Sequence, residues 1–261
     1  MSLEDWMEPD RRRERASSFG SAAALYDRIR PTYPPPAVTW ALAPLGAGPW
    51  RVVDLGAGTG IMTRVISGLG QHTVAVEPDD LMRQRLTETT PGIEALPGTA
   101  ESLPLPDGSV DAVIAAQAYH WFNRERAHRE IGRVLRRGGV FAAIWNERDE
   151  ATPWVAEYSR IVEGDRGPNG AGADSGRVGP ASYGDLFGPV EPATFRHDVW
   201  HTPDSLVELL RSRSYYITAA DDRKAALEAG VRQLAATHPD LAGRTEFGLP
   251  YETLVYRATR L

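Results

Sequence analysis

The sequence predicts an α/β protein whose core is a doubly wound, mostly parallel sheet. From about residue 50 onward, short runs rich in valine, isoleucine and aromatic residues alternate with longer segments whose apolar residues recur at helical spacing. A glycine-rich turn also separates the first of these runs from the first helical segment. Strands and helices that alternate in this way build parallel sheets with helices on both faces.

Four short runs are expected to form the central strands, because nearly continuous apolar sequence is typical of strands buried on both faces. They cover residues 51–55, 73–77, 110–115 and 140–145. Helices are expected between them at 60–69, 79–88 and 123–136. The first helix should close at Gly70 and the last at Gly138 and Gly139, since glycine readily adopts the left-handed conformation that ends many helices.

The flanking regions have less regular patterns. A helix expected at 19–30 precedes a proline-rich connection that runs to residue 50. Residues 164–184 hold seven glycines and two prolines, so we expect a mobile surface loop there. The remaining expected elements are helices at 154–162, 205–211 and 223–236 and strands at 193–201 and 251–258.

The composition excludes several kinds of chemistry. None of the 261 residues is cysteine, which excludes disulfides, thiolate metal sites and a cysteine nucleophile. The formal net charge is -6, and the arginines within residues 11–15 are interspersed with acids, which disfavours a nucleic-acid partner. The uncharged stretch 31–50 is rich in proline and the first ten residues are acidic. We therefore expect no membrane span and no signal peptide, and a cytoplasmic location.

The most informative segment is the turn at residues 52–60, Val-Val-Asp-Leu-Gly-Ala-Gly-Thr-Gly. Its three glycines permit a sharp turn and let a ligand approach the main chain. A phosphate-binding P-loop does not fit, because Ile61 and Met62 stand where lysine and serine or threonine are required. A nicotinamide fingerprint fits poorly, because Ile61 occupies its third glycine position. Asp54, ahead of the turn, would repel a pyrophosphate and favours a cationic ligand group.

A second acid, Glu77, ends the next expected strand, 23 residues after Asp54. An acid in this place can accept hydrogen bonds from both hydroxyls of a ribose. Together with the glycine turn it indicates a ribose-containing cofactor, and on these two features alone a nicotinamide protein stays open.

The acid followed by three alternating glycines resembles motif I of the class I S-adenosylmethionine-dependent methyltransferases, whose cofactor carries an ammonium and a sulfonium. The stretch 98–111 matches the segment of that family that follows the third strand. The run Tyr-His-Trp-Phe at 119–122 resembles the type 11 small-molecule branch, and more closely its trans-aconitate-methyltransferase-like group, as do residues 26–34 and 249–257. The resemblance covers most of the chain and is weak between residues 151 and 193.

This resemblance implies a Rossmann-like class I methyltransferase fold, with a seven-stranded, mostly parallel sheet whose last strand is antiparallel. It divides the chain into an N-terminal helical flap (1–45), a cofactor-binding α/β core (46–146), a flexible insertion or lid (147–192) and a C-terminal part that completes the sheet and the substrate pocket (193–261).

The cofactor that the resemblance implies is S-adenosyl-L-methionine. Asp54 and the glycine turn would hold its methionine end, Glu77 its ribose, and Ala100 with Glu101 would border its adenine. The expected cofactor contacts are Asp54, Gly56, Ala57, Gly58, Gly60, Glu77, Pro78, Ala100, Glu101, Gln117, Tyr26, Arg30 and Tyr33. The expected acceptor contacts are Tyr119, Trp121, Trp145, Arg213, Tyr215 and Tyr251.

The expected reaction is methyl transfer to an oxygen of a small molecule, with a carboxylate among the candidates. His120 is the candidate general base for a hydroxyl or amine acceptor, with a positioning role as the alternative. A carboxylate is already ionised and needs no base, so orientation and desolvation can provide the rate. Arg213 can grip a carboxylate or complement a helix dipole. No metal site is expected, because His197 and His201 lie about 13 Å apart on a predicted strand.

Two other functions stay open on the sequence. A regulatory protein that binds S-adenosylmethionine without transferring methyl groups would have the same glycines and Glu77, and a nicotinamide-dependent oxidoreductase is the less favoured alternative. The expected partner is a small-molecule acceptor, with no nucleic acid and no membrane. The sequence leaves the oligomeric state open.

Overall fold

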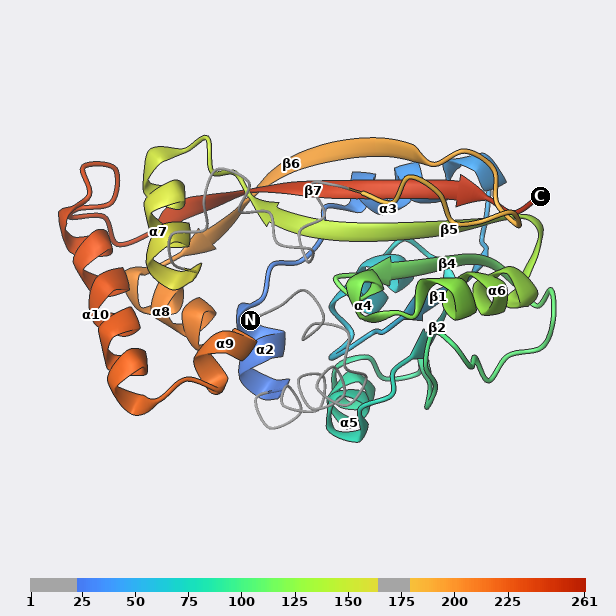
Figure 1. Ribbon diagram of the computed structural model, residues 1–261, viewed down its shortest axis with the longest axis horizontal. Coiled ribbons are helices and arrows are strands. Elements are labelled where there is room, and N and C mark those ends of the chain that lie inside the picture. The colour runs from blue at the N-terminus through green and yellow to red at the C-terminus, as the bar shows by residue number, and fades with distance from the viewer. Residues whose placement is uncertain (1–22, 164–178) are drawn as a thin grey trace.

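The computed structural model describes residues 23–163 and 179–261, through which a seven-stranded sheet runs (Figure 1). The strand order is β3-β2-β1-β4-β5-β7-β6. The ladders among β1 to β5 are parallel, whereas β7 is antiparallel to both β5 and β6. This confirms the predicted sheet with its antiparallel last strand. The strands are β1 Arg51–Leu55, β2 His72–Val76, β3 Glu94–Leu96, β4 Val110–Ala116, β5 Leu135–Arg148, β6 Glu191–His201 and β7 Phe247–Thr259.

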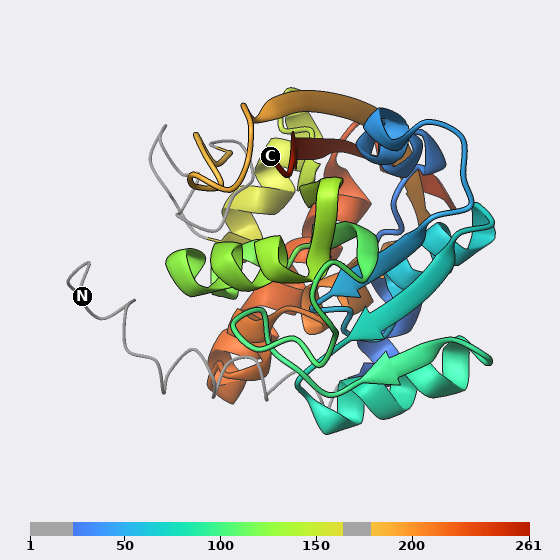
Figure 2. The same ribbon diagram turned by 90° about the vertical axis from the view of Figure 1, so that its right-hand side faces the viewer.

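Helices cover both faces of the parallel strands. Alternate residues of a strand point to opposite faces, so Val53 of β1 joins one hydrophobic core with α6, and Val52 joins another with α3 and α4. Figure 2 shows α6 and α3 on opposite sides of the sheet. The helices are α2 Ala23–Ile29, α3 Pro35–Leu42, α4 Ile61–Gly68, α5 Asp80–Thr89, α6 Arg124–Val134, α7 Pro153–Glu163, α8 Pro203–Arg211, α9 Ser214–Ile217 and α10 Asp221–Thr237, with 3₁₀ turns η3 Ala43–Leu45 and η4 Tyr119–Trp121.

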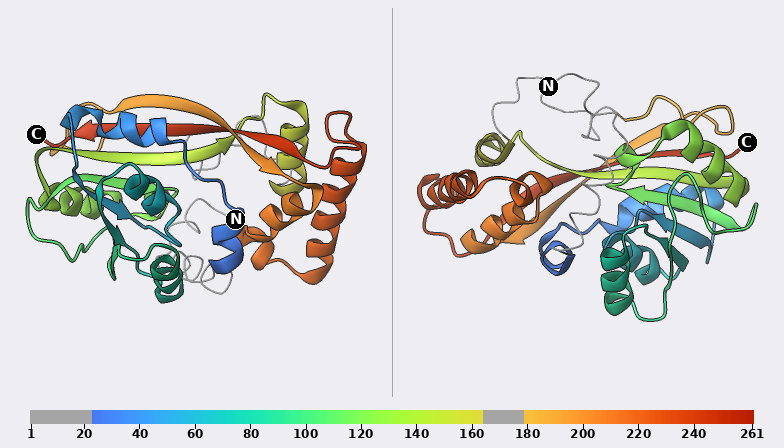
Figure 3. Two further views of the ribbon diagram at one scale, coloured as in Figure 1. Left: turned by 180° about the vertical axis from the view of Figure 1, so that it is seen from behind. Right: turned by 60° about the horizontal axis from the view of Figure 1, so that its bottom comes forward.

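A third core lies beyond the parallel strands, where α7, α8 and α10 pack together (Figures 1 and 3). Together with α9 we call these helices the helical unit. β5 and β7 are 14 and 13 residues long, and they extend past the short strands to reach this unit. At the contact, the ring of Trp154 from α7 lies 5.4 Å from the ring of Phe247 from β7.

The proline-rich connection contains a helix that the sequence did not predict. α3 begins directly after Pro34, with proline in its first turn. Proline is tolerated there because the first backbone N–H groups of a helix have no partner within the helix, and its fixed φ suits helix entry. The prolines at 34 to 36 therefore start a helix rather than prevent one.

The prediction of a surface loop at 164–184 is wrong for the end of that segment. Residues 164–178 lie outside the described residues, but Tyr183 is fully buried. Its ring centroid lies 4.5 Å from that of Phe141 on β5, and its hydroxyl donates to the carbonyl oxygen of Tyr256 at 2.8 Å. Tyr183 thus anchors the return of the chain to the sheet, together with the buried Phe187.

The helix expected at 123–136 also ends earlier than its glycines suggested. α6 stops at Val134 and β5 begins at Leu135, so Gly138 and Gly139 lie inside the strand. A Cβ on Gly139 would lie 2.8 Å from the carbonyl oxygen of Arg136, so this glycine relieves a close backbone approach. Within the described residues, no helix is both long and apolar enough to cross a membrane.

Candidate functional site

The glycine turn follows β1 and enters α4. Gly56, Gly58 and Gly60 have φ angles of 70°, 55° and 89°, in the left-handed region that favours glycine. A Cβ on Gly56 would lie 2.7 Å from the Cβ of Ala118, whereas no atom lies within 4 Å of the place a Cβ would take on Gly58. The turn is therefore fixed by glycine backbone geometry, and at Gly58 its main chain is open to a ligand.

Asp54 is the buried acid of β1, one residue before the strand ends. Its side chain has no exposed surface, and Oδ2 accepts a hydrogen bond from the Thr63 hydroxyl at 2.6 Å. Oδ1 is buried without a hydrogen-bond partner among the described residues. Burial raises the pKa of Asp54 to about 7, and the neighbouring charge of Glu77 acts in the same direction. A cationic group that reached Oδ1 would find an acceptor with no competing donor.

Glu77 lies directly after β2 and is tied to the glycine turn. Its Oε2 accepts from the backbone N–H of Gly58 at 2.8 Å, and its Oε1 accepts from the N–H of Asp79 at 2.9 Å. The side chain is 7% exposed, and burial raises its pKa. Since β1 and β2 are parallel neighbours, the two acids stand at the same edge of the sheet. This is the edge at which doubly wound folds bind ligands.

Several predicted cofactor residues surround this pair. Ala57 is buried in the turn and Pro78 follows Glu77. Ala100 is buried in the core after β3, and Glu101 beside it accepts from the backbone N–H of Asn123 at 2.7 Å. Glu101 therefore connects the segment after β3 to the start of α6.

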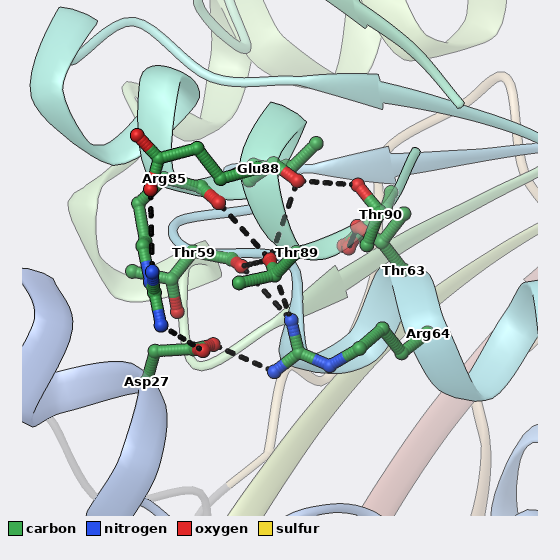
Figure 4. Close-up of polar contacts among 10 residues, drawn as sticks. Asp27, Thr59, Thr63, Arg64, Arg85, Glu88, Thr89 and Thr90 are labelled. Atoms are coloured by element: carbon green, nitrogen blue, oxygen red, sulfur yellow. Dashed lines mark hydrogen bonds and ion pairs between the residues drawn. The ribbon is translucent and has the colours of Figure 1, made fainter. Parts of the chain in front are cut away.

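Helix α2 is fastened to this region by an acid that the sequence analysis missed (Figure 4). Asp27 pairs with Arg64 of α4 at 2.6 Å and with Arg85 of α5 at 3.5 Å. Arg64 also donates to the Thr59 carbonyl oxygen in the glycine turn at 3.1 Å and to the Thr89 hydroxyl at 2.9 Å. We call Asp27, Arg64 and Arg85 the α2 latch. These partners are far apart in sequence, so no local pattern predicts the latch.

A second fastening lies on the other side of the same helix. Arg28 pairs with Glu208 of α8 at 2.8 Å. In Figure 1, α2 accordingly lies between α5 and the helical unit. The short helix thus bridges the glycine turn and the C-terminal helices.

The turn after β4 is held by a strained residue and a polar network. Gln117 is the non-glycine residue with positive φ, 51°, in the described part of the chain. Its side-chain amide donates to the Asn146 carbonyl oxygen at 2.9 Å. The Asn146 amide donates to the Thr32 carbonyl oxygen at 3.0 Å, and its Oδ1 accepts from the Thr253 hydroxyl at 2.6 Å. Asn146 and Thr253 were not predicted, and they hold the N-terminal segment against β5 and β7.

The aromatic run after β4 divides between core and surface. Tyr119 is 1% exposed, and its hydroxyl lies 2.9 Å from Nε2 of His128. Trp145 is 4% exposed and stands edge-on to Tyr119, with ring centroids 5.9 Å apart. His120 and Trp121 are half-buried, with ring centroids 4.9 Å apart. Tyr119 and Trp145 therefore pack in the core beneath the turn. Of this predicted group, only His120 and Trp121 reach the surface.

The remaining predicted residues form a separate group where α2, α9 and β7 meet. The guanidinium of Arg30 lies 4.7 Å over the ring of Tyr26 and donates to the Ser212 carbonyl oxygen at 3.3 Å. Arg213 follows Ser212 and lies close enough to Arg30 to lower its pKa. Tyr215, Tyr251 and Tyr33 complete the group. Tyr33 also lies near Asp54, so it stands between this group and the glycine turn.

Comparisons with known proteins agree on one family. Residues 53–143 match the family model described as a methyltransferase domain. The chain is 43% identical over 254 residues to an uncharacterized methyltransferase of Mycobacterium tuberculosis, covering 95% of this chain and 98% of that protein. Over 133 residues it is 35% identical to a malonyl-[acyl-carrier protein] O-methyltransferase of Methylococcus capsulatus, covering 48% of each. A solved structure described as a putative type II methyltransferase from Anaeromyxobacter dehalogenans matches with a TM-score of 0.62 and 27% identity, covering 88% of this chain and 97% of that one.

Proposed function

The chain belongs to the methyltransferase family, and on this basis we propose that it transfers the methyl group of S-adenosylmethionine to an oxygen atom of a small molecule. The observation that carries the proposal is the placement of Asp54 and Glu77 at one sheet edge, on either side of the glycine turn. S-adenosylmethionine supplies an activated methyl group: the carbon–sulfur bond breaks as the carbon–oxygen bond forms, and the electron pair stays on sulfur to leave S-adenosylhomocysteine.

The residues of the site fit this cofactor. An ammonium group would pair with Oδ1 of Asp54, which has no partner among the described residues. The Glu77 carboxylate accepts two backbone N–H bonds and keeps lone pairs for ribose hydroxyls, because a carboxylate has about four acceptor sites. The open main chain at Gly58 lets the cofactor lie against the turn. Ala100 and Glu101 would then border the adenine.

An oxygen acceptor is supported by two considerations. The partial relative from Methylococcus capsulatus is named an O-methyltransferase. A carboxylate needs no base, and for a hydroxyl acceptor His120, at the surface of the turn after β4, would take the proton. Trp121 beside it would face the same space and exclude water.

The Glu77→Ala variant tests the proposal. We expect its affinity for S-adenosylhomocysteine, measured by calorimetry, to fall by about 1 to 3 kcal/mol, because the ribose hydroxyls lose their acceptor. The control is Glu94→Ala, which removes an exposed acid from β3 and should leave the affinity unchanged. Unchanged affinity in Glu77→Ala would refute the ribose contact.

Two outcomes would redirect the assignment. If the wild-type protein bound NADH and neither S-adenosylmethionine nor S-adenosylhomocysteine, it would be an oxidoreductase candidate. If it bound S-adenosylmethionine but formed no S-adenosylhomocysteine with a broad panel of acids, phenols and amines, a regulatory role would replace catalysis.

A further inference from the structure

Two arginines and three tyrosines meet between the N-terminal segment and the helical unit. Arg30 follows α2 and Arg213 joins α8 to α9, while Tyr158, Tyr215 and Tyr251 come from α7, α9 and β7. We call these five residues the arginine–tyrosine cluster. In the antiparallel ladder of β5 and β7, Tyr251 lies opposite Arg148, the last residue of β5. The cluster therefore lies at the carboxyl end of that strand. Ligands of doubly wound sheets bind at this edge.

Five polar atoms of the cluster are buried without partners among the described residues. Nε of Arg30, Nε of Arg213 and the hydroxyls of all three tyrosines are inaccessible to water and make no hydrogen bond to the described residues. Tyr158 and Tyr251 are themselves 0% and 1% exposed. Buried donors are almost always paired, so five unpaired groups in one place indicate a missing acceptor.

The charges of the cluster also indicate that an acceptor is missing and that it is an anion. Burial and the adjacent charge of Arg213 lower the pKa of Arg30 to about 10. The nearby Arg148 is different, because it forms an ion pair with Glu163 and donates to the Ser159 hydroxyl at 2.9 Å. No carboxylate of the described residues pairs with Arg30 or Arg213 in this way. The cluster therefore holds excess positive charge that an anion would neutralise.

The donors of the cluster select the chemistry of that anion. Guanidinium groups offer only donors, in a planar fork that matches a carboxylate, and tyrosine hydroxyls can add further donors. The charges and dipoles that act on Arg30 are those of Arg213 and of tyrosines, whereas Thr63, Glu77 and Arg64 act on Asp54. The cluster is therefore distinct from the pair of acids that would hold the cofactor.

We infer that Arg30, which was expected from the sequence to contact the cofactor, instead joins Arg213 and the hydroxyls of Tyr215 and Tyr251 in binding a carboxylate of the acceptor. This carboxylate anchors the acceptor and is not itself methylated. This rests on the proposed function only in identifying the bound acid as the methyl acceptor. A carboxylate held by two guanidiniums loses basicity and hence nucleophilicity. The acceptor therefore carries a second oxygen nucleophile, which makes it a hydroxy acid or a dicarboxylic acid.

We call the proposed carboxylate site of Arg30, Arg213, Tyr215 and Tyr251 the anchor. Binding of malonate tests the anchor without any need for methyl transfer. Malonate is titrated by calorimetry into the protein with and without saturating S-adenosylhomocysteine. We expect the Arg213→Gln variant to weaken malonate binding at least tenfold and Tyr251→Phe, which removes only a hydroxyl, to weaken it threefold or more. S-adenosylhomocysteine affinity should stay unchanged in both. The control is Arg232→Gln, because Arg232 is half-exposed on α10 and pairs with Asp204.

The same variant distinguishes a binding role from a structural one. Without ligand, Arg213→Gln relieves the repulsion between two half-buried cations, so its melting temperature should rise above that of the wild type. Malonate should raise the melting temperature of the wild type and of Arg232→Gln, but not that of Arg213→Gln. A lower melting temperature in ligand-free Arg213→Gln would overturn the inference in favour of a structural arginine.

Other outcomes are equally decisive. The anchor is overturned if malonate does not bind the wild-type protein or binds Arg213→Gln equally well. If Arg213→Gln lowers S-adenosylhomocysteine affinity and leaves malonate binding intact, the carboxylate belongs to the cofactor instead. Malonate binding that depends on Arg213 in a protein that binds no S-adenosylhomocysteine would preserve the anchor and refute the proposed function.

Methylated products test the second half of the inference. With monocarboxylic, dicarboxylic and hydroxy acids as acceptors, every methylated product should retain a free carboxylate. Formation of the methyl ester of a simple monocarboxylic acid would show that the anchored group is the reacting group.

Discussion

At the scale of single residues, the ionisation of Asp54 should control cofactor affinity. Burial raises its pKa to about 7 in the ligand-free protein, and an ammonium bound at Oδ1 would lower it again. Binding then releases a proton below pH 7, so the affinity for S-adenosylhomocysteine should rise from pH 5.5 and level off above about pH 7.5, by up to about tenfold per pH unit. Calorimetry across this range measures the profile.

The Asp54→Asn variant is the control for that profile. It keeps the shape of the side chain but cannot ionise, so its affinity should be weaker at pH 8 and nearly independent of pH. An identical pH profile in wild type and variant would assign the dependence to another group.

Local spacing made part of the candidate site predictable. Asp54 lies one residue before the end of β1, the glycines and Glu77 follow strand ends, and the structure brings them all to one edge. The aromatic run after β4 gave no such information, because a 3₁₀ turn directs Tyr119 into the core and His120 outward. Which residue of an irregular turn faces the core depends on tertiary packing, not on composition.

At the scale of elements, the α2 latch should hold α2 against α4 and α5. Asp27 is 10% exposed between Arg64 and Arg85, so Asp27→Asn removes two ion pairs and leaves the arginines to repel each other. The destabilisation of the docked helix should be about 1 to 2 kcal/mol, because these pairs are partly buried. Hydrogen exchange of backbone amides in residues 23–29 should accordingly be about 5- to 30-fold faster.

The opposite face of the helix provides a matched comparison. Arg28→Gln removes one pair whose arginine is 60% exposed, so it should change exchange in α2 much less. Equal effects of the two variants would show that α2 is held by its apolar contacts and not by the latch.

The prediction of helices and strands succeeded where the apolar pattern was long and failed where it was short. β1 was predicted with its observed bounds, because its residues are buried on both faces. β3 has three residues with an exposed or half-buried pattern, too few to give a period. α3 was missed because its prolines are compatible with a helix only in its first turn, which sequence composition does not reveal. The burial of Tyr183 depends on Phe141 and Tyr256, which lie on other elements.

At the scale of the whole molecule, the long strand β7 connects the three larger cores. β7 contributes Ala258 to the core on the α6 face, Val255 to the core on the α3 face, and Leu249 to the core of the helical unit. The arginine–tyrosine cluster lies where the third core meets the others, so its geometry depends on the helical unit remaining docked. Sequence patterns identify α7, α8 and α10 of this unit but not the short α9, and they do not show that two arginines from distant segments meet there.

Because β7 is shared, we expect the sheet and the helical unit to unfold together. Leu209 is fully buried in α8, and Leu209→Ala should destabilise the protein by about 2 to 4 kcal/mol through the cavity it creates. The urea midpoints of unfolding measured by circular dichroism and by tryptophan fluorescence should both fall by the same amount and stay coincident. Leu81→Ala, at a residue that is 53% exposed on α5, should leave the midpoint nearly unchanged. A two-step curve in Leu209→Ala, with part of the helical signal lost in a separate step at lower urea concentration, would mean that the helical unit folds independently and that β7 does not couple the cores.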